Sequence, residues 1–255
     1  MPAIDVDTSG APERNEYGMN QRSASEIQRQ YYAETADRYD SMHVHAGDEH
    51  YFALEVMLAA VDFYGIESVL DIGSGTGRAV AHVKRARPAL RVKGVEPVGE
   101  LRDIGYRNGI SREDLVAGDA LALPFEDGAF DLVCEFGVLH HIKTPARAVG
   151  EMLRVAKKAV FIADSNNFGQ GSVFARTIKQ TFNALGLWPL VDFIKTRGRG
   201  YTISEGDGLA YSYSVFNDYG QIRAQCKSVH LVNTVDAGVN PYRTATHVAL
   251  LGIKQ

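Results

Sequence analysis

Short apolar blocks alternate with amphipathic stretches through the middle of the chain. The apolar blocks cover residues 66–72, 91–96, 114–118, 129–136 and 158–164. Apolar residues recur at helical spacing in residues 76–86, 99–108 and 145–154, which lie between these blocks. Buried strands that alternate with helices are typical of a doubly wound, mostly parallel sheet, so the pattern predicts an α/β fold.

The two ends of the chain extend this pattern. Helical periodicity predicts two N-terminal helices, over 24–42 and 49–64, before the first strand. A helix over 215–225 and two strands, 229–235 and 246–253, follow near the C-terminus. The turn-rich link "DAGVNPYR" is short enough to make these two strands antiparallel. Residues 1–22 are polar with scattered Pro and Gly, and we expect a disordered leader there.

The alternation breaks between residues 165 and 213. This segment contains two helix-like pieces, 172–185 and 188–195, and then the polar stretch "TRGRGYTISEGDG", which we expect to be a loop. We interpret 165–213 as an insertion that covers the ligand-binding edge of the sheet. The prediction is therefore one domain over 23–255, with N-terminal helices over 23–64.

Composition and charge indicate which classes of binding partner to exclude. A formal net charge of −4 over 255 residues lacks the basic footprint of a nucleic-acid-binding protein, so we expect no nucleic-acid partner. No segment is apolar enough to span a bilayer, and we expect no membrane partner. The two cysteines lie far apart without a CxxC motif, which favours a reduced, cytoplasmic protein. A monomer or a homodimer fits these features.

A glycine-rich turn, "VLDIGSGTGR", follows the first predicted strand. It lacks the lysine of a Walker A loop, and Arg78 stands where a dinucleotide fingerprint has its third glycine. Acidic residues also end the first three strands: Asp71 in this turn, Glu96 in "GVEP" and Asp119 in "GDALALPFEDGAFDLV".

With these motifs and "VLHHI", the chain resembles a class I S-adenosylmethionine-dependent methyltransferase of the small-molecule group, over about residues 66–164. The resemblance implies seven strands, the last of them antiparallel, and S-adenosylmethionine as cofactor, with S-adenosylhomocysteine as product. It implies that the cofactor-binding residues are Asp71, Gly73, Gly75, Gly77, Glu96, Pro97, Asp119, Ala120, Glu135 and Phe136. In this assignment Glu96 accepts bonds from the ribose hydroxyls and Asp119 accepts one from the adenine amine, as carboxylates can.

Two groups of side chains are candidates for closing the site and for proton transfer. His140 and His141 follow the fourth long strand, and either could accept a proton or simply shape the pocket. The resemblance favours His141 as the base. On the N-terminal helix we expect Tyr31 or Tyr32 to touch the cofactor as part of a lid, and Tyr39 to lie in the core.

The insertion offers candidate substrate contacts. Arg197 and Arg199 lie near Lys195 among glycines, and they could bind an anionic substrate or belong to a solvated loop. Tyr211 and Tyr213 alternate in "GLAYSYSVF" and could line an aromatic pocket or pack the lid.

The histidines of "HVHAGDEH", His43, His45 and His50, have no spacing typical of a metal site. A polar loop between helices is the favoured interpretation, and we expect no metal.

The sequence thus predicts an enzyme that methylates a small molecule. O-methylation of a natural product or sugar derivative is the first hypothesis, and N- or C-methylation stays open. A nicotinamide-dependent oxidoreductase and a cofactor-binding protein without catalysis are the remaining alternatives.

Overall fold

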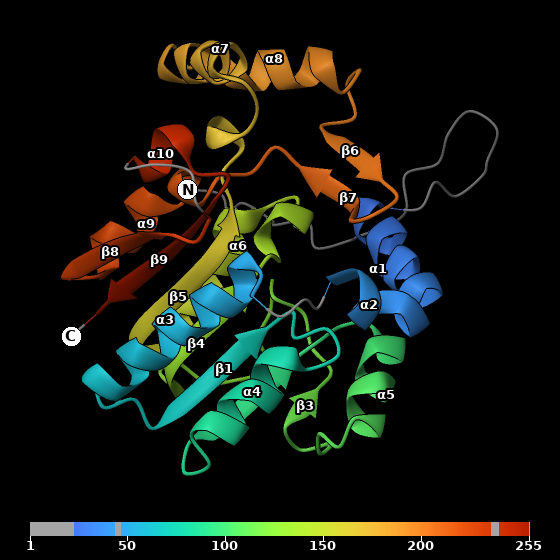
Figure 1. Cartoon of the computed structure of the whole chain (residues 1–255), viewed down its shortest axis with the longest axis vertical. Coiled ribbons are helices and arrows are strands. Elements are labelled where there is room, and N and C mark those ends of the chain that lie inside the picture. The colour runs from blue at the N-terminus through green and yellow to red at the C-terminus, as the bar shows by residue number, and fades with distance from the viewer. Residues whose placement is uncertain (1–22, 44–46, 236–239, 255) are drawn as a thin grey trace, which may run out of the picture.

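A seven-stranded sheet forms the centre of the molecule (Figure 1). The computed structural model describes residues 23–43, 47–235 and 240–254; the predicted leader, 1–22, lies outside them. The strand order is β3-β2-β1-β4-β5-β9-β8. The strands are β1(Ser68–Ile72), β2(Arg91–Val95), β3(Leu115–Val116), β4(Phe130–Phe136), β5(Ala156–Ser165), β8(Ser228–Asn233) and β9(His247–Ile253).

The pairing of these strands confirms the expected topology. β1 pairs in parallel with β2 and β4, and β4 pairs in parallel with β5. β9 is antiparallel to both β5 and β8. The carboxyl ends of β1, β2, β4 and β5 therefore meet at one edge of the sheet, where open α/β sheets bind ligands.

Helices cover both faces of the sheet. Those before the insertion are α1(Ala24–Thr35), α2(Tyr39–His43), α3(Glu49–Phe63), α4(Arg78–Ala86), α5(Gly99–Arg107) and α6(Pro145–Val155). Those after α6 are α7(Val173–Ala184), α8(Trp188–Lys195), α9(Tyr219–Gln225) and α10(Pro241–Thr244). One buried apolar cluster joins α3 and α4 to the sheet, and a second joins α6 and α9 to it. No helix among the described residues is both long and apolar enough to cross a membrane.

Helix α1 begins with a capping motif, and a short turn separates it from α2. Ser23 and Glu26 form a reciprocal capping box at the start of α1. A 3₁₀ turn, Ala36–Arg38, separates α1 from α2, so the predicted helix over 24–42 is bent. The bend lets α1 and the 3₁₀ turn pack against α5, around Ala36 and Leu101.

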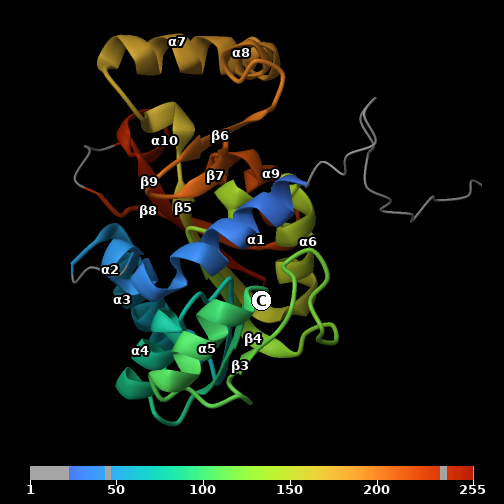
Figure 2. The same cartoon turned by 90° about the vertical axis from the view of Figure 1, so that its right-hand side faces the viewer.

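The insertion stands over the carboxyl edge of the sheet (Figures 1 and 2). α7 and α8 lie outermost, and a two-stranded hairpin, β6(Tyr201–Ser204) and β7(Gly208–Tyr211), reaches down toward α1. The expectation of a loop in "TRGRGYTISEGDG" was wrong. The Glu205–Asp207 turn leads into Gly208, whose φ of +70° suits a hairpin.

Asn166 ties the insertion to the sheet. Its side chain is fully buried, and its amide donates to the carbonyls of Tyr242 and Ala245 at 2.8 and 2.9 Å. Its Oδ1 accepts the Ser214 hydroxyl at 2.8 Å. Because each of these groups is buried, loss of the amide would leave several polar atoms unsatisfied. The chain therefore enters and leaves the insertion at one fixed point.

Substitution of Gly169 tests the packing at the junction between the insertion and the sheet. A Cβ at this position would lie 1.8 Å from the carbonyl oxygen of Ala245, a backbone atom. We expect Gly169→Ala to lower the free energy of unfolding by about 2 kcal/mol or more, measured by urea denaturation. Gly220→Ala is the control, because nothing lies within 4 Å of a Cβ there. Equal stabilities of the two variants would contradict the packing described.

Candidate active site

Four carboxylates lie at the carboxyl ends of the parallel strands. Asp71, Glu96, Glu135 and Asp164 end or follow β1, β2, β4 and β5, and none is more than 5% exposed. Burial raises the pKa of Asp71 and of Glu96 to about 7. Burial also raises the pKa of Glu135 well above its usual range. A buried carboxylate needs hydrogen-bond donors, so these residues shape the loops that follow the strands.

The glycine turn is built around Glu96. Gly73, Gly75 and Gly77 all have positive φ, between +56° and +82°, a region that favours glycine. The Gly75 N–H donates to Glu96 Oε2 at 2.9 Å, and the Val98 N–H donates to Oε1 at 2.8 Å. One carboxylate oxygen thus holds the glycine turn, and the other holds the start of α5.

The N-terminal helices close over this turn. Tyr39, expected in the core, packs against the buried cluster around Ala36 and Leu101 and also lies over Gly75, where a Cβ would be 2.7 Å from the tyrosine hydroxyl oxygen. Arg29 of α1 forms an ion pair with Asp119 Oδ2 at 2.6 Å, while Oδ1 accepts the Leu121 N–H. Ala120 is half-buried beside Asp119, and Pro97 is exposed next to Glu96.

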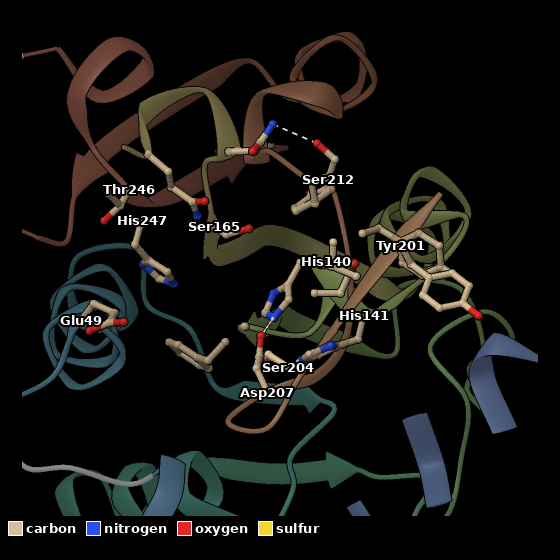
Figure 3. A pocket seen from close by; sticks show the side chains of 18 of the residues that line it. Glu49, His140, His141, Ser165, Tyr201, Ser204, Asp207, Ser212, Thr246 and His247 are labelled. Carbon is tan, nitrogen blue, oxygen red and sulfur yellow. Dashed lines mark hydrogen bonds and ion pairs between the residues drawn. The ribbon is translucent and has the colours of Figure 1, made fainter. Parts of the chain in front are cut away.

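A cavity of about 600 Å³ lies between the sheet edge and the insertion (Figure 3). Phe136, Gly137 and Arg78 line its sheet side, and Tyr32 and Tyr39 line it from the N-terminal helices. Lys195, Tyr201, Ser204, Asp207, Tyr211 and Ser212 are among the lining residues from the insertion. The three parts of the chain therefore share one pocket, whose wall is mostly hydroxyl, imidazole and charged groups.

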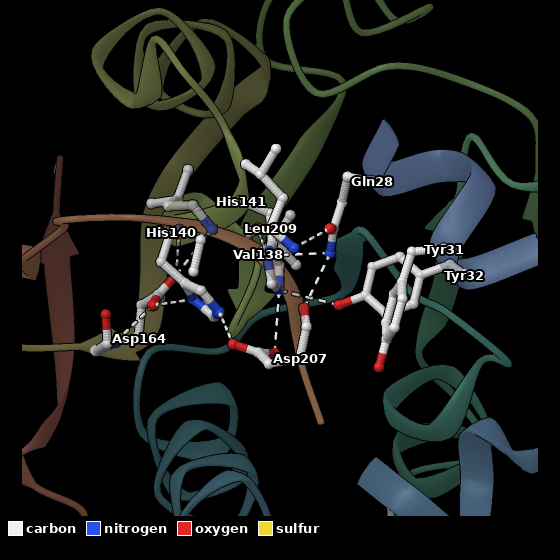
Figure 4. A network of polar contacts seen from close by, with 12 residues as sticks. Gln28, Tyr31, Tyr32, Val138, His140, His141, Asp164, Asp207 and Leu209 are labelled. Carbon is white, nitrogen blue, oxygen red and sulfur yellow. Dashed lines mark hydrogen bonds and ion pairs between the residues drawn. The ribbon is translucent and has the colours of Figure 1, made fainter. Parts of the chain in front are cut away.

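His140 is held between two carboxylates (Figure 4). Its Nδ1 lies 2.7 Å from Asp164 Oδ1, and its Nε2 lies 3.3 Å from Asp207 Oδ2. Burial disfavours the imidazolium, but the two carboxylates outweigh burial and raise the pKa of His140 well above its usual range. The same pairing lowers the pKa of Asp164 below its usual range against the effect of its burial.

His141 is fixed by residues from α1 and from the hairpin (Figure 4). Its Nδ1 lies 2.7 Å from the carbonyl oxygen of Leu209, which can only accept, so Nδ1 carries a proton. Its Nε2 lies 2.9 Å from the Tyr32 hydroxyl. Gln28 supports this arrangement by fixing Leu209, because its Oε1 accepts the Leu209 N–H at 2.5 Å. In the neutral ring, the lone pair on Nε2 therefore faces the pocket side, where Tyr32 and Asp207 lie.

The remaining residues predicted to contact the cofactor or the substrate differ in whether they line the pocket. Tyr31 donates to the Glu205 carbonyl at 2.6 Å and does not line the pocket, so Tyr32 is the lid tyrosine that does. Arg197 and Arg199 are also absent from the pocket wall, where Lys195 lies instead. Tyr211 lines the pocket and is half-buried; Tyr213 also touches it, but is 2% exposed and donates to Asp218 at 2.9 Å.

Of the three N-terminal histidines, His50 alone has its side chain in the described part of the chain. His45 and the His43 side chain lie outside it, and His50 faces His247 from β9 with ring centroids 4.9 Å apart. Burial lowers the pKa of each of these two rings to about 4. His50 Nδ1 and His247 Nε2 are buried and have no hydrogen-bond partner among the described residues. Both residues line the pocket.

Sequence reasoning missed Asp207, Asp164 and Gln28 as site residues. Asp207 lies between glycines in "EGDG", which could have indicated a hairpin turn but not its position. Gln28 lies 113 residues before His141. Only the folded chain brings them together.

Comparison with known proteins agrees with this site. Residues 70–163 match the family model described as a methyltransferase domain. The chain is 41% identical over 128 residues to a demethylmenaquinone methyltransferase from Thermobifida fusca, which covers 48% of this chain and 53% of that protein. It is 34% identical over 95 residues to norajmaline N-methyltransferase from Rauvolfia serpentina, covering 35% and 32%. Residues 70–163 thus form a methyltransferase domain, and the similarity supports a class I S-adenosylmethionine-dependent methyltransferase.

Solved structures of methyltransferases share the fold. Magnesium protoporphyrin IX methyltransferase from Synechocystis PCC 6803, with bound S-adenosylhomocysteine, has a TM-score of 0.58 at 14% identity, covering 91% of this chain and 100% of that one. A possible histamine N-methyltransferase from Thermotoga maritima has a TM-score of 0.55 at 18% identity, covering 89% and 99%. The predicted family, fold class and family cofactor, S-adenosylmethionine, are confirmed.

The sequence similarity is centred on the methyltransferase domain. The chain spans about half the length of the demethylmenaquinone methyltransferase, and about a third of the norajmaline N-methyltransferase. The family model ends at residue 163, just before the insertion that forms one side of the pocket.

The buried Glu96 predicts a pH dependence of stability. Its pKa of about 7 in the folded protein lies above the ordinary value of 4.5, so folding favours the protonated form. This contribution is present at acidic pH and is lost as the pH rises through about 7. We expect Glu96→Gln to flatten the decline of unfolding free energy between about pH 5 and pH 7.5.

Urea denaturation over this pH range measures the effect. Glu100→Gln, at an exposed position in the first turn of α5, is the matched control and should keep the wild-type slope. A Glu96→Gln slope equal to that of wild type would contradict the assigned pKa.

Proposed function

We propose that this methyltransferase transfers a methyl group from S-adenosylmethionine to an oxygen of a small polar molecule held in the pocket. The observation that carries the proposal is the shared cavity. It is lined on one side by residues next to the glycine turn and on the other by the insertion. Holding two reactants in such a cavity supplies alignment, which removes much of the barrier to a displacement.

The predicted cofactor residues suit the cofactor chemically. Bound S-adenosylmethionine supplies the reactive methyl group on its sulfonium. The two oxygens of Glu96 would accept bonds from the ribose diol, and the turn of Gly73, Gly75 and Gly77 leaves backbone close to any ligand above it. Asp119 would accept the adenine amine beside its existing partner, Arg29.

The pocket wall favours a polar, oxygen-bearing acceptor. Ser165, Ser204, Ser212, Thr196, Thr202 and Thr246 contribute hydroxyl groups to it. Lys195 and Arg78 add positive charge. Such groups pair with hydroxyls and carboxylates of a ligand, which supports a sugar derivative or an oxygenated natural product over a hydrocarbon.

His141 is the better placed of the two histidines to act on an acceptor. His140 faces a carboxylate with each ring nitrogen, so neither nitrogen is directed at an acceptor alone. The Nδ1 of His141 pairs with the Leu209 carbonyl, which leaves Nε2, next to the Tyr32 hydroxyl, as the ring atom that faces the pocket. This nitrogen can accept a proton or bind a cation.

N- and C-methylation are the alternatives within the same family. The relatives named above include an N-methyltransferase, and one of the structural neighbours is a possible histamine N-methyltransferase. A panel of hydroxylated, amine and carbon acceptors, assayed with methyl-labelled cofactor, distinguishes these reactions. Labelling of amines alone would contradict the O-methylation proposal.

Calorimetry with S-adenosylhomocysteine tests the cofactor site. We expect wild type to bind it and Glu96→Ala to weaken binding by about 10- to 100-fold, the cost of losing hydrogen bonds to a charged group. Glu100→Ala is the control on the neighbouring helix. Binding of NAD without S-adenosylhomocysteine would favour the oxidoreductase alternative, and unchanged affinity in Glu96→Ala would remove the ribose assignment.

His141→Ala tests the acceptor side. We expect turnover with an acceptor from the panel to fall at least about 10-fold, while affinity for S-adenosylhomocysteine changes less than about threefold. His230→Ala, an exposed histidine on β8, should match wild type. A loss of cofactor affinity that matches the loss of turnover would move His141 to cofactor binding.

A further inference from the structure

We propose that His140, His141 and Asp207 bind a divalent transition-metal ion of the Zn²⁺ type on the wall of the pocket. The sequence contains no metal-binding spacing for these residues, since Asp207 is 66 positions beyond His141. The fold nevertheless brings one ligand atom from each to within 4.8 Å of the others. The ion's role as an anchor for an acceptor oxygen rests on the proposed function, whereas its binding does not.

The two imidazole–carboxylate distances are close to those between neighbouring ligands of one ion, and all three ligand atoms lie within 4.8 Å of one another. His140 Nε2 lies 3.3 Å from Asp207 Oδ2, and His141 Nε2 lies 3.4 Å from Asp207 Oδ1. Zn²⁺ with bonds of about 2.0 to 2.1 Å in a tetrahedral arrangement places neighbouring ligands about 3.3 Å apart. The two distances are longer than the mode of a charge-assisted hydrogen bond, about 2.7 to 2.9 Å.

The Nδ1 atoms of His140 and His141 already make the hydrogen bonds that are usual for histidine ligands in metal sites. A histidine ligand usually donates its second N–H to a carboxylate or a backbone carbonyl, which fixes the ring. His140 Nδ1 pairs with Asp164 at 2.7 Å, and His141 Nδ1 pairs with the Leu209 carbonyl at 2.7 Å. Both rings therefore turn Nε2 toward the same carboxylate (Figure 4).

The site is open on one side. The Asp207 side chain is 45% exposed, and all three residues line the cavity of about 600 Å³ (Figure 3). Two imidazoles and one carboxylate leave a coordination position for a water molecule or an oxygen of a ligand, as in catalytic zinc sites. Imidazole ligands favour zinc, iron, cobalt or nickel over magnesium or calcium.

The ion would also join two parts of the fold. The histidines come from the 3₁₀ turn Leu139–His141 after β4, whereas Asp207 comes from the hairpin of the insertion. Bound metal would thus hold the hairpin against the sheet edge and complete the pocket. An acceptor with a hydroxyl or carboxylate oxygen could then bind the ion directly.

Calorimetric titration of metal-free protein with Zn²⁺ tests the site. The protein is first treated with a chelator and dialysed, and no cofactor or acceptor is added. We expect one Zn²⁺ to bind per chain, and Asp207→Asn to weaken that binding at least about 10-fold. Co²⁺ provides a second readout, because an ordered site with nitrogen and oxygen ligands gives visible absorption that the variant should lose.

Two variants control for non-specific binding. Glu205→Gln makes the same change of charge on the same hairpin, two residues from Asp207, and His230→Gln removes an exposed histidine. Both should bind Zn²⁺ as wild type does. Circular dichroism checks that Asp207→Asn is folded, and His140→Gln repeats the test from the other side of the site.

The outcomes separate this proposal from the proposed function. Absence of Zn²⁺ binding to wild type, or equal affinity in wild type and Asp207→Asn, overturns the metal site even if the protein methylates an acceptor. One-to-one binding that depends on Asp207 and His140 supports the site even if no acceptor in the panel is methylated. Failure to bind S-adenosylhomocysteine contradicts only the proposed function.

Discussion

Burial of carboxyl groups at the carboxyl edge of the sheet is the constraint on which the site depends. Asp71, Glu96, Glu135 and Asp164 lie there with almost no exposure, and loop backbone supplies donors to the last three of them. Glu96 holds the glycine turn, Glu135 accepts the Val138 N–H at 2.8 Å, and Asp164 accepts the Leu139 N–H at 2.8 Å. The turn that carries both histidines is thereby fixed from two strands, before any ligand binds.

The second layer of the site comes from segments distant in sequence. The hairpin of the insertion supplies Asp207 and the Leu209 carbonyl, and α1 supplies Gln28 and Tyr32, all around the two histidine rings. The contacts of Gln28 and Leu209 satisfy polar groups that the fold would otherwise bury without a partner. The same contacts close the pocket, so its shape and the orientation of His141 are coupled. A metal ion at His140, His141 and Asp207 would strengthen this coupling.

Sequence patterns predicted the parts of the fold that depend on local periodicity. The order of strands and helices from 66 to 164 and the antiparallel final strand agree with the structure, because buried strands and amphipathic helices leave a strong signal. The glycine turn follows β1 and is bonded to Glu96. The β6–β7 hairpin differs from expectation, and Tyr39 packs against a buried cluster while also lying over Gly75. Polar residues with glycines do not distinguish a loop from an exposed hairpin, and an aromatic residue at helical spacing fits a core or a lid equally well.

The sequence by itself determined the sheet, the glycine turn and the family, since each depends on residues that are close in the chain or on a strand's own pattern of burial. Tertiary structure alone decided which residues line the pocket. It placed Lys195 in the pocket and left Arg197 and Arg199 outside it, and it set Asp207 against His140 and His141. The physical reason is that an inserted segment is positioned by long-range contacts, such as those of the buried Asn166, and these contacts have no periodicity that a sequence could reveal.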